Sequence, residues 1–130
     1  MTATYLDSSA IVKLAADEPE SAALRRHLRG KRPLVSSALA RAEVLRALMS
    51  PDDLGIARGR AVLSRMEVLR VNDRILNLAG SLQPSSLRTL DAIHLATAIG
   101  LGRDLGQIVT YDERMAEGAR QLGLKAVSPG

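Results

Sequence analysis

The chain contains no cysteine, no phenylalanine and no tryptophan, and its two tyrosines are Tyr5 and Tyr111. Without cysteine it forms neither a disulfide framework nor a thiolate metal site. Two tyrosines provide no platform on which successive nucleic-acid bases can stack. The core must therefore consist of aliphatic side chains, and a nucleic acid bound here would be selected by its shape and backbone.

Long apolar runs are also absent. No stretch approaches the roughly 18 apolar residues of a membrane span, and the amino terminus lacks the basic-then-apolar pattern of an export signal. These absences favour a cytoplasmic protein with no membrane partner. The 130 residues, 46% hydrophobic and 25% charged, suit a single globular domain over residues 1–130. The net charge of +4 is a modest excess that favours a polyanion or an acidic protein as partner.

Short β-prone runs alternate with helical patterns along the chain. The strands are expected at 2–7, 33–37, 66–71, 107–112 and 125–130. Helices are expected from residue 8 to a break near Pro19, then to Gly30, and over 38–49, 56–65, 72–82, 90–100 and 113–123. We expect Pro19 to be a first helical residue, and Ser36 or Ser37, Asn72 and Thr89 to cap helices. The alternation predicts an α/β fold with a parallel sheet and helices on both faces.

Four acidic residues are expected at one edge of this sheet. Asp7 follows "TYL" and Asp112 follows "VTY", so both come at the carboxyl ends of strands, where open parallel sheets bind ligands. Glu43 and Asp91 lie early in helices that begin at the same edge. These four side chains are therefore predicted to face one crevice.

Repulsion between the four carboxylates means that such a crevice requires either bound protons or a cation. Two carboxylates about 4 Å apart repel by roughly 4 kcal/mol at an effective dielectric constant of 20, whereas a domain is stable by only about 5–15 kcal/mol. Either some of the acids hold protons, with a raised pKa, or a divalent cation lies among them. Ligation by oxygen alone suits Mg²⁺, or Mn²⁺, and such an ion supports phosphodiester hydrolysis.

Each acid also has a purely structural interpretation. A carboxylate in the first turn of a helix stabilises the helix dipole by about 0.3–1 kcal/mol, and a surface glutamate pairs readily with a neighbouring arginine. Under this interpretation Asp7 and Asp112 cap helices, Asp91 complements a dipole, and Glu43 pairs with Arg41 or Arg46. Spacing alone leaves both interpretations open.

Four stretches carry a resemblance to a known family: "YLDSSAIVKL" at 5–14, "SSALARAEVLRA" at 36–47, "LRTLDAIHLATA" at 87–98 and "VTYDERM" at 109–115, with "LGLKAVSPG" at the end. In combination they resemble the PIN-domain ribonucleases of the VapC toxin type. The resemblance implies a PIN-like three-layer α/β/α sandwich with a five-stranded parallel sheet. It also implies that Asp7, Glu43, Asp91 and Asp112 are the catalytic residues and form a Mg²⁺-binding cluster. Glu113 adjoins Asp112 and leaves the choice of the fourth acid open; Asp112 is preferred.

The resemblance further implies a function. The chain would be an endoribonuclease, the toxin of a toxin–antitoxin pair, directed at structured RNA such as tRNA or rRNA, forming a homodimer and silenced by a VapB-type antitoxin. Alternatives are a structure-specific DNA nuclease with the same acids, a catalytically idle partner-binding module and, more weakly, a phosphoacceptor domain.

Several other residues have two interpretations. Ser8 and Thr110 adjoin cluster acids, so their hydroxyls are expected to support the ligands, although Ser8 also suits a helix cap. His94, one turn from Asp91, either orients that acid or packs in the helix.

The run "RRHLRGKR" at 25–32 suits an RNA backbone, but also the carboxyl end of a helix. Arg114 is a further candidate for a phosphate contact. Leu14, Leu24 and Leu28 suit either an apolar groove for an antitoxin helix or the ordinary core.

Overall fold

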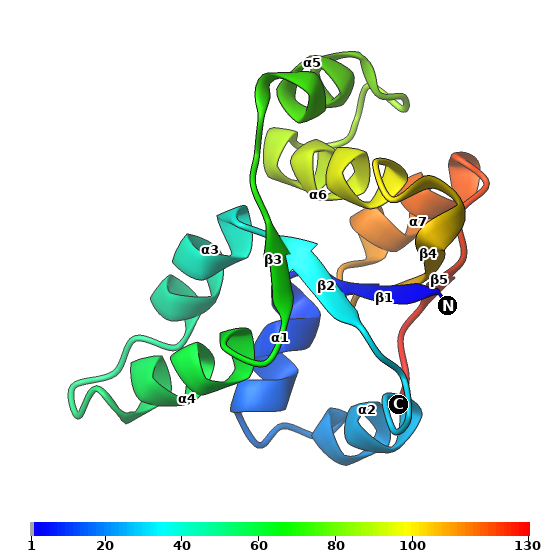
Figure 1. The fold of residues 1–130 in the computed structure, drawn as a ribbon. Helices are drawn as coiled ribbons and strands as arrows, with labels where there is room; N and C mark the ends of the chain where they lie inside the picture. The colour runs from blue at the N-terminus through cyan, green and yellow to red at the C-terminus, as the bar shows by residue number, and fades with distance from the viewer. Residues whose placement is uncertain (1) are drawn as a thin grey trace.

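A five-stranded parallel β-sheet lies at the centre of the structure, a computed structural model that describes residues 2–130 (Figure 1). Its strands stand in the order β3-β2-β1-β4-β5. They are β1 (Ala3–Leu6), β2 (Leu34–Ser37), β3 (Glu67–Leu69), β4 (Leu105–Val109) and β5 (Ala126–Val127). Each neighbouring pair is parallel. Because β1 is the central strand and β4 is beside it, residues that follow these two strands emerge next to one another.

Helices cover both faces of the sheet, as the alternating pattern predicts (Figure 1). They are α1 (Ser8–Ala15), α2 (Ser21–His27), α3 (Leu39–Ala47), α4 (Leu54–Leu63), α5 (Asp73–Ser81), α6 (Thr89–Ile99) and α7 (Glu113–Gln121), with a short 3₁₀ helix η1 (Gly102–Asp104). The helices α1 to α4 pack on one face and α6 and α7 on the other, while α5 packs on the outside of α6. The predicted three-layer sandwich is confirmed.

Two aliphatic cores fill the spaces between the sheet and its helices. Successive side chains of a strand point to opposite faces, so Tyr5 of β1 enters one core and Leu6 enters the other. The first core includes Leu95, Ile108 and Met115, and the second includes Ile11, Leu24, Val44 and Val109. Both cores are closed without phenylalanine or tryptophan.

The helix ends agree only in part with the predicted caps. Asn72 caps α5 as expected, accepting a hydrogen bond from the Ile75 amide. Thr89 does not cap α6, because it is already the first residue of that helix and Arg88 occupies the cap position. Pro19 is likewise not helical, since α2 begins at Ser21.

The start of α3 agrees in part with the predicted serine cap. The cap position is Ala38, while the Ser37 hydroxyl accepts a hydrogen bond from the Leu39 amide. None of the helices formed by residues 2–130 has both the length and the apolar character required to cross a bilayer.

Candidate active site

Asp7 lies directly after the central strand and closes the first turn of α1. One carboxyl oxygen accepts hydrogen bonds from the Ala10 amide, at 3.1 Å, and the Ser9 hydroxyl, at 2.6 Å. The other oxygen accepts from the Thr110 hydroxyl, so the contact expected of Thr110 is present. Asp7 is 4% exposed. Burial raises its pKa, and these hydrogen bonds oppose the rise only in part. Asp7 is therefore both a helix cap and a desolvated carboxyl group.

Glu43 lies on α3 and faces the same edge of the sheet. One of its oxygens accepts hydrogen bonds from the Ser8 hydroxyl and from His94 Nε2, the latter at 2.6 Å. Neither Arg41 nor Arg46 pairs with it among residues 2–130. Burial alone would raise the pKa of Glu43, but the hydrogen bonds from His94 and Ser8 outweigh it and lower that pKa. The surface ion pair considered from the sequence is therefore not formed.

Asp91 and Asp112 share one cation, the guanidinium of Arg88. Arg88 Nε lies 3.4 Å from Asp91 Oδ2, and its Nη2 lies 3.1 Å from Asp112 Oδ2. Burial raises the pKa of Asp91, and the charge of Asp112 raises it further. The predicted effect of like charges is thus present, although burial is the larger cause. The nearby Arg88 guanidinium opposes the rise in the pKa of Asp91. The two carboxyls are therefore already paired with one positive charge from the protein.

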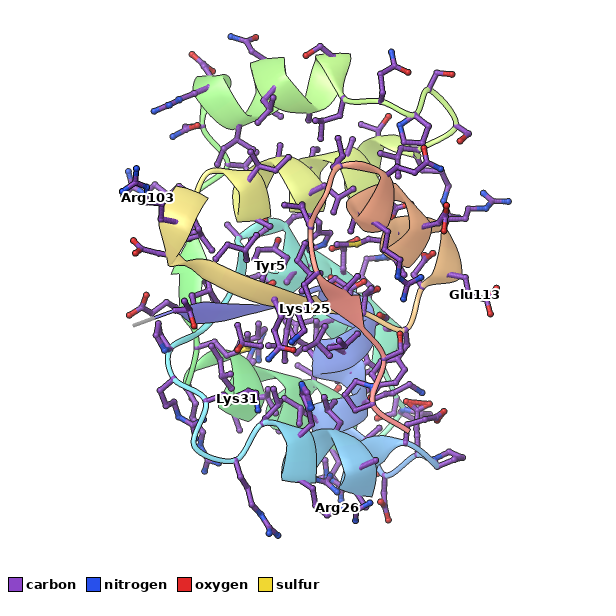
Figure 2. The ribbon with its side chains drawn as sticks, turned by 90° about the vertical axis from the view of Figure 1, so that its right-hand side faces the viewer. Tyr5, Arg26, Lys31, Arg103, Glu113 and Lys125 are labelled. Carbon is purple, nitrogen blue, oxygen red and sulfur yellow. The ribbon has the colours of Figure 1, made fainter. Side chains whose placement is uncertain are left out.

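Of the two adjacent acids, Asp112 and not Glu113 faces Arg88 and Asp91. Asp112 caps α7 by accepting from the Arg114 and Met115 amides. Glu113 is the first residue of α7, and its exposed side chain projects from the outside of the molecule (Figure 2). Arg114 contributes this backbone contact, whereas Arg88 brings its guanidinium to the acids. No sequence motif marks Arg88 as part of the site, since its bond to Asp112 joins residues 24 positions apart.

His94 belongs to the site in a way that the sequence does not reveal. It is 2% exposed, and it contacts Glu43 instead of orienting Asp91. Its Nδ1 lies 2.7 Å from the hydroxyl of Tyr5, which is buried between the sheet and α6 (Figure 2). Tyr5 and His94 are 89 positions apart, and no local pattern marks their contact.

The four acids lie around one region but are not drawn together into a cage. Ser8, the neighbour of Asp7, donates to Glu43, the Thr110 hydroxyl contacts both the Asp7 carboxyl and the Asp112 amide, and Arg88 links Asp112 to Asp91. Within residues 2–130, no three His, Cys, Asp or Glu side chains form a group that could hold a metal ion.

The donor set nevertheless fits a hard divalent cation. It consists of carboxylate oxygens, which are the ligands that Mg²⁺ and Mn²⁺ prefer. The Arg88 guanidinium between Asp91 and Asp112 stands where a shared positive charge is needed.

Comparisons with known proteins identify the family of the chain. A family model described as "PIN domain" matches residues 4–121. Ribonuclease VapC46 of Mycobacterium tuberculosis (strain ATCC 25618 / H37Rv) is 59% identical over 129 residues, which cover 99% of both chains. Ribonuclease VapC47 of M. tuberculosis (strain CDC 1551 / Oshkosh) is 37% identical, over 97% of this chain and 96% of that protein.

Solved structures share the fold at low sequence identity. VapBC2 from Rickettsia felis, bound to a DNA fragment from its promoter, matches with a TM-score of 0.77 and 14% identity, over 99% of this chain and 100% of that chain. The sarcin-ricin loop cleaving toxin VapC20 of M. tuberculosis matches with a TM-score of 0.73 and 16% identity, over 97% and 99% of the two chains. From the family model and the relatives of 37–59% identity, the chain belongs to the PIN-domain family and, within it, to the VapC ribonucleases.

Proposed function

We propose that this protein is a Mg²⁺-dependent endoribonuclease and the toxin of a type II toxin–antitoxin pair, which cleaves structured RNA such as tRNA or rRNA. The observation that carries the proposal is the buried Asp7 carboxylate at the end of the central strand, on the edge where Asp91 and Asp112 share a cation. We take the chain to work as one domain over residues 1–130, in the cytoplasm.

The proposed ligands are Asp7, Glu43, Asp91 and Asp112, with Asp112 preferred to Glu113. PIN-domain ribonucleases generally depend on divalent metal ions, and the all-oxygen donor set favours Mg²⁺, with Mn²⁺ as a substitute. When bound, such an ion polarises the scissile phosphate and promotes ionisation of the attacking water. Ser8 and Thr110 hold Glu43 and Asp7 in place through their hydroxyls.

Arg88 is the side chain best placed to meet the substrate. Its guanidinium lies beside Asp91 and Asp112, and 59% of its side chain is exposed. A planar guanidinium binds phosphate oxygens in pairs. Arg88 therefore orients the RNA backbone at the site while water attacks phosphorus in line.

An apolar groove with arginines supports the antitoxin as partner. A cavity of about 310 Å³ lies between α1, α2, α4 and the start of β2. Its lining combines Leu14, Leu28, Leu34, Val62 and Met66 with Arg25, Arg29, Arg32 and Arg65. Of the two interpretations open for Leu24, a groove or the ordinary core, the core is the one observed, because Leu24 is fully buried. The lining fits an acidic amphipathic helix, so we assign part of the basic run 25–32 to the antitoxin.

A second apolar surface supports the homodimer. No residue of α5 is buried, and Leu76 on α5 and Leu90 on α6 are 46% and 48% exposed. Leucines that are half exposed on adjacent helices suit a contact between two copies of the chain.

A cleavage assay tests the proposed function. The wild-type protein should cut structured RNA in Mg²⁺ and lose this activity in EDTA. Asp7→Asn and Asp91→Asn should each lower the rate by about 100-fold or more, while Glu113→Gln, the matched control at an exposed neighbour, should stay close to wild type. Mapping the RNA ends gives the cleavage position.

Three outcomes would contradict the proposal. Cutting of DNA in preference to RNA would indicate a DNA nuclease. Cutting that persists in Asp91→Asn would remove the acids from the mechanism. Growth arrest that persists when this variant is expressed would indicate a protein that acts only by binding a partner.

A further inference from the structure

A chain of hydrogen bonds runs from the interior of the protein to the candidate site. Tyr5 on β1 bonds to Nδ1 of His94 on α6, at 2.7 Å, and His94 Nε2 bonds to Glu43 on α3, at 2.6 Å. Tyr5 is 0% exposed and His94 is 2% exposed. Three separate elements therefore meet at one imidazole ring.

The surroundings of His94 make this ring unusual for a core residue. The other buried residues of α6 are Ala92, Ile93, Leu95, Ala96, Thr97 and Ala98, so His94 is the one titratable side chain buried on this helix. A polar ring in an aliphatic core is costly unless its nitrogens are hydrogen-bonded. Both nitrogens of His94 are bonded here, and one of them is bonded to an acid of the site.

The partners also fix the direction of the hydrogen bonds. An ionised carboxylate only accepts hydrogen bonds, so His94 Nε2 must carry the hydrogen that Glu43 receives. In the neutral ring, which carries one hydrogen on its two nitrogens, the Tyr5 hydroxyl then donates to Nδ1. The buried Ser36 hydroxyl has no hydrogen-bond partner among residues 2–130.

Ring packing restricts the orientation as well. The rings of Tyr5 and His94 meet edge to face, with centroids 5.9 Å apart and an interplanar angle of 77°. Glu43, by contrast, has no lysine or arginine partner among the described residues. Its carboxylate is held by His94 and Ser8 alone.

We propose that His94 is a positioning residue of the nuclease: fixed by Tyr5, its imidazole orients the Glu43 carboxylate toward the other acids. This inference rests on the proposed function, because it assigns Glu43 to the metal-binding acids. Groups that orient a metal ligand from behind typically change metal affinity or activity by about 10–100-fold when removed.

Three variants test the proposal. His94→Leu removes both hydrogen bonds, His94→Gln keeps one donor and one acceptor, and Tyr5→Phe removes only the hydroxyl. Mg²⁺ affinity is measured by calorimetry, and kcat and KM are measured on one RNA. His94→Leu should weaken Mg²⁺ binding and lower kcat by about 10–100-fold with KM unchanged. His94→Gln should recover most of both losses, and Tyr5→Phe should fall between Gln and wild type.

A spectroscopic measurement is independent of activity and of the folding of the leucine variant. In the wild-type protein, ¹⁵N NMR of His94 should show hydrogen on Nε2 and none on Nδ1, and Tyr5→Phe should reduce this preference. A ring with hydrogen on Nδ1 alone would overturn the proposal. Equal losses in His94→Gln and His94→Leu, or wild-type Mg²⁺ affinity in His94→Leu, would also overturn it.

Failure of the proposed function gives a different result. In that case the wild-type protein itself neither binds Mg²⁺ nor cleaves RNA. If the wild-type protein does both and the variants behave alike, only the role of His94 is rejected.

Discussion

The carboxyl group of Asp7 has two roles, one structural and one in the candidate site. It caps α1 through the Ala10 amide and accepts from Thr110 on the neighbouring strand end, yet it is also a candidate ligand. Burial raises its pKa, so the folded protein binds a proton at Asp7 more readily than the unfolded chain does. Stability from this group is present below the pKa of the unfolded chain and is lost as the pH rises through the pKa of the folded protein.

Asp7→Asn should therefore change how stability depends on pH. Asparagine caps helices about as well as aspartate and has no charge to desolvate. In EDTA at pH 7 the variant should melt higher than wild type by on the order of a few degrees, and the difference should shrink as the pH is lowered toward 4. Mg²⁺ should raise the melting temperature of wild type only. Parallel pH profiles for the two proteins would contradict this account.

Arg88 is the second residue with a measurable consequence. It forms ion pairs with Asp91 and Asp112, so a divalent cation must compete with Arg88 for these two carboxylates. Arg88→Ala should tighten Mg²⁺ binding by roughly twofold to tenfold, because each exposed ion pair contributes about 0.2–1 kcal/mol. Arg88→Lys, which keeps the charge, is the control. Calorimetry checks both variants, and an unchanged affinity in Arg88→Ala would rule out competition.

At the scale of the elements, the packing of α4 against α3 requires a close backbone contact as well as the right hydrophobic pattern. Gly55, the second residue of α4, lies against Leu48, the residue that directly follows α3, the helix that carries Glu43. A Cβ at Gly55 would lie 2.0 Å from the Leu48 carbonyl oxygen, a contact with backbone that cannot move aside easily. Helix propensity alone would favour alanine there by up to about 1 kcal/mol, so the two effects oppose each other.

Gly55→Ala should be destabilising despite its better helix propensity. We expect a loss of about 1–3 kcal/mol, typical of overpacking, measured by urea denaturation. Gly80→Ala is the matched control, since a Cβ at Gly80 on α5 meets nothing within 4 Å. That variant should gain about 0.5–1 kcal/mol. If both variants gained stability, the close contact at Leu48 would be excluded.

At the scale of the whole molecule, the arginine-lined groove proposed for the antitoxin and the acids lie at opposite ends of the strands. The groove includes Leu34 at the start of β2 and Met66 just before β3, while Asp7 follows the end of β1. Binding at the groove therefore need not share side chains with the candidate active site.

Charge reversal in the groove should separate the two activities. Arg29→Glu should weaken binding of the cognate antitoxin by about tenfold and leave RNA cleavage near wild type. Arg103→Glu, at η1 and distant from α2 (Figure 2), should change neither. Titration of the antitoxin by calorimetry checks the result, and equal effects of the two reversals would exclude a specific role for the groove.

The sequence predicts the fold better than it predicts the contacts within the site. Alternating strands and helices permit few topologies, because parallel strands need crossovers, and Asp7 and Asp112 follow from the strand ends alone. Arg88 and the partners of His94 do not. The bond from Arg88 to Asp112 and the bonds of His94 join residues 24 to 89 positions apart, and tertiary packing selects these partners.

The central position of β1 has a consequence for synthesis. Asp7 leaves the ribosome early, but the hydroxyl that binds it, on Thr110, is encoded 103 positions later, and β4 must form beside β1 before the two can meet. Chains emerge amino terminus first, at about 5–20 residues per second. A growing chain therefore cannot assemble the candidate site until Thr110 and β4 have been synthesised and have folded beside β1.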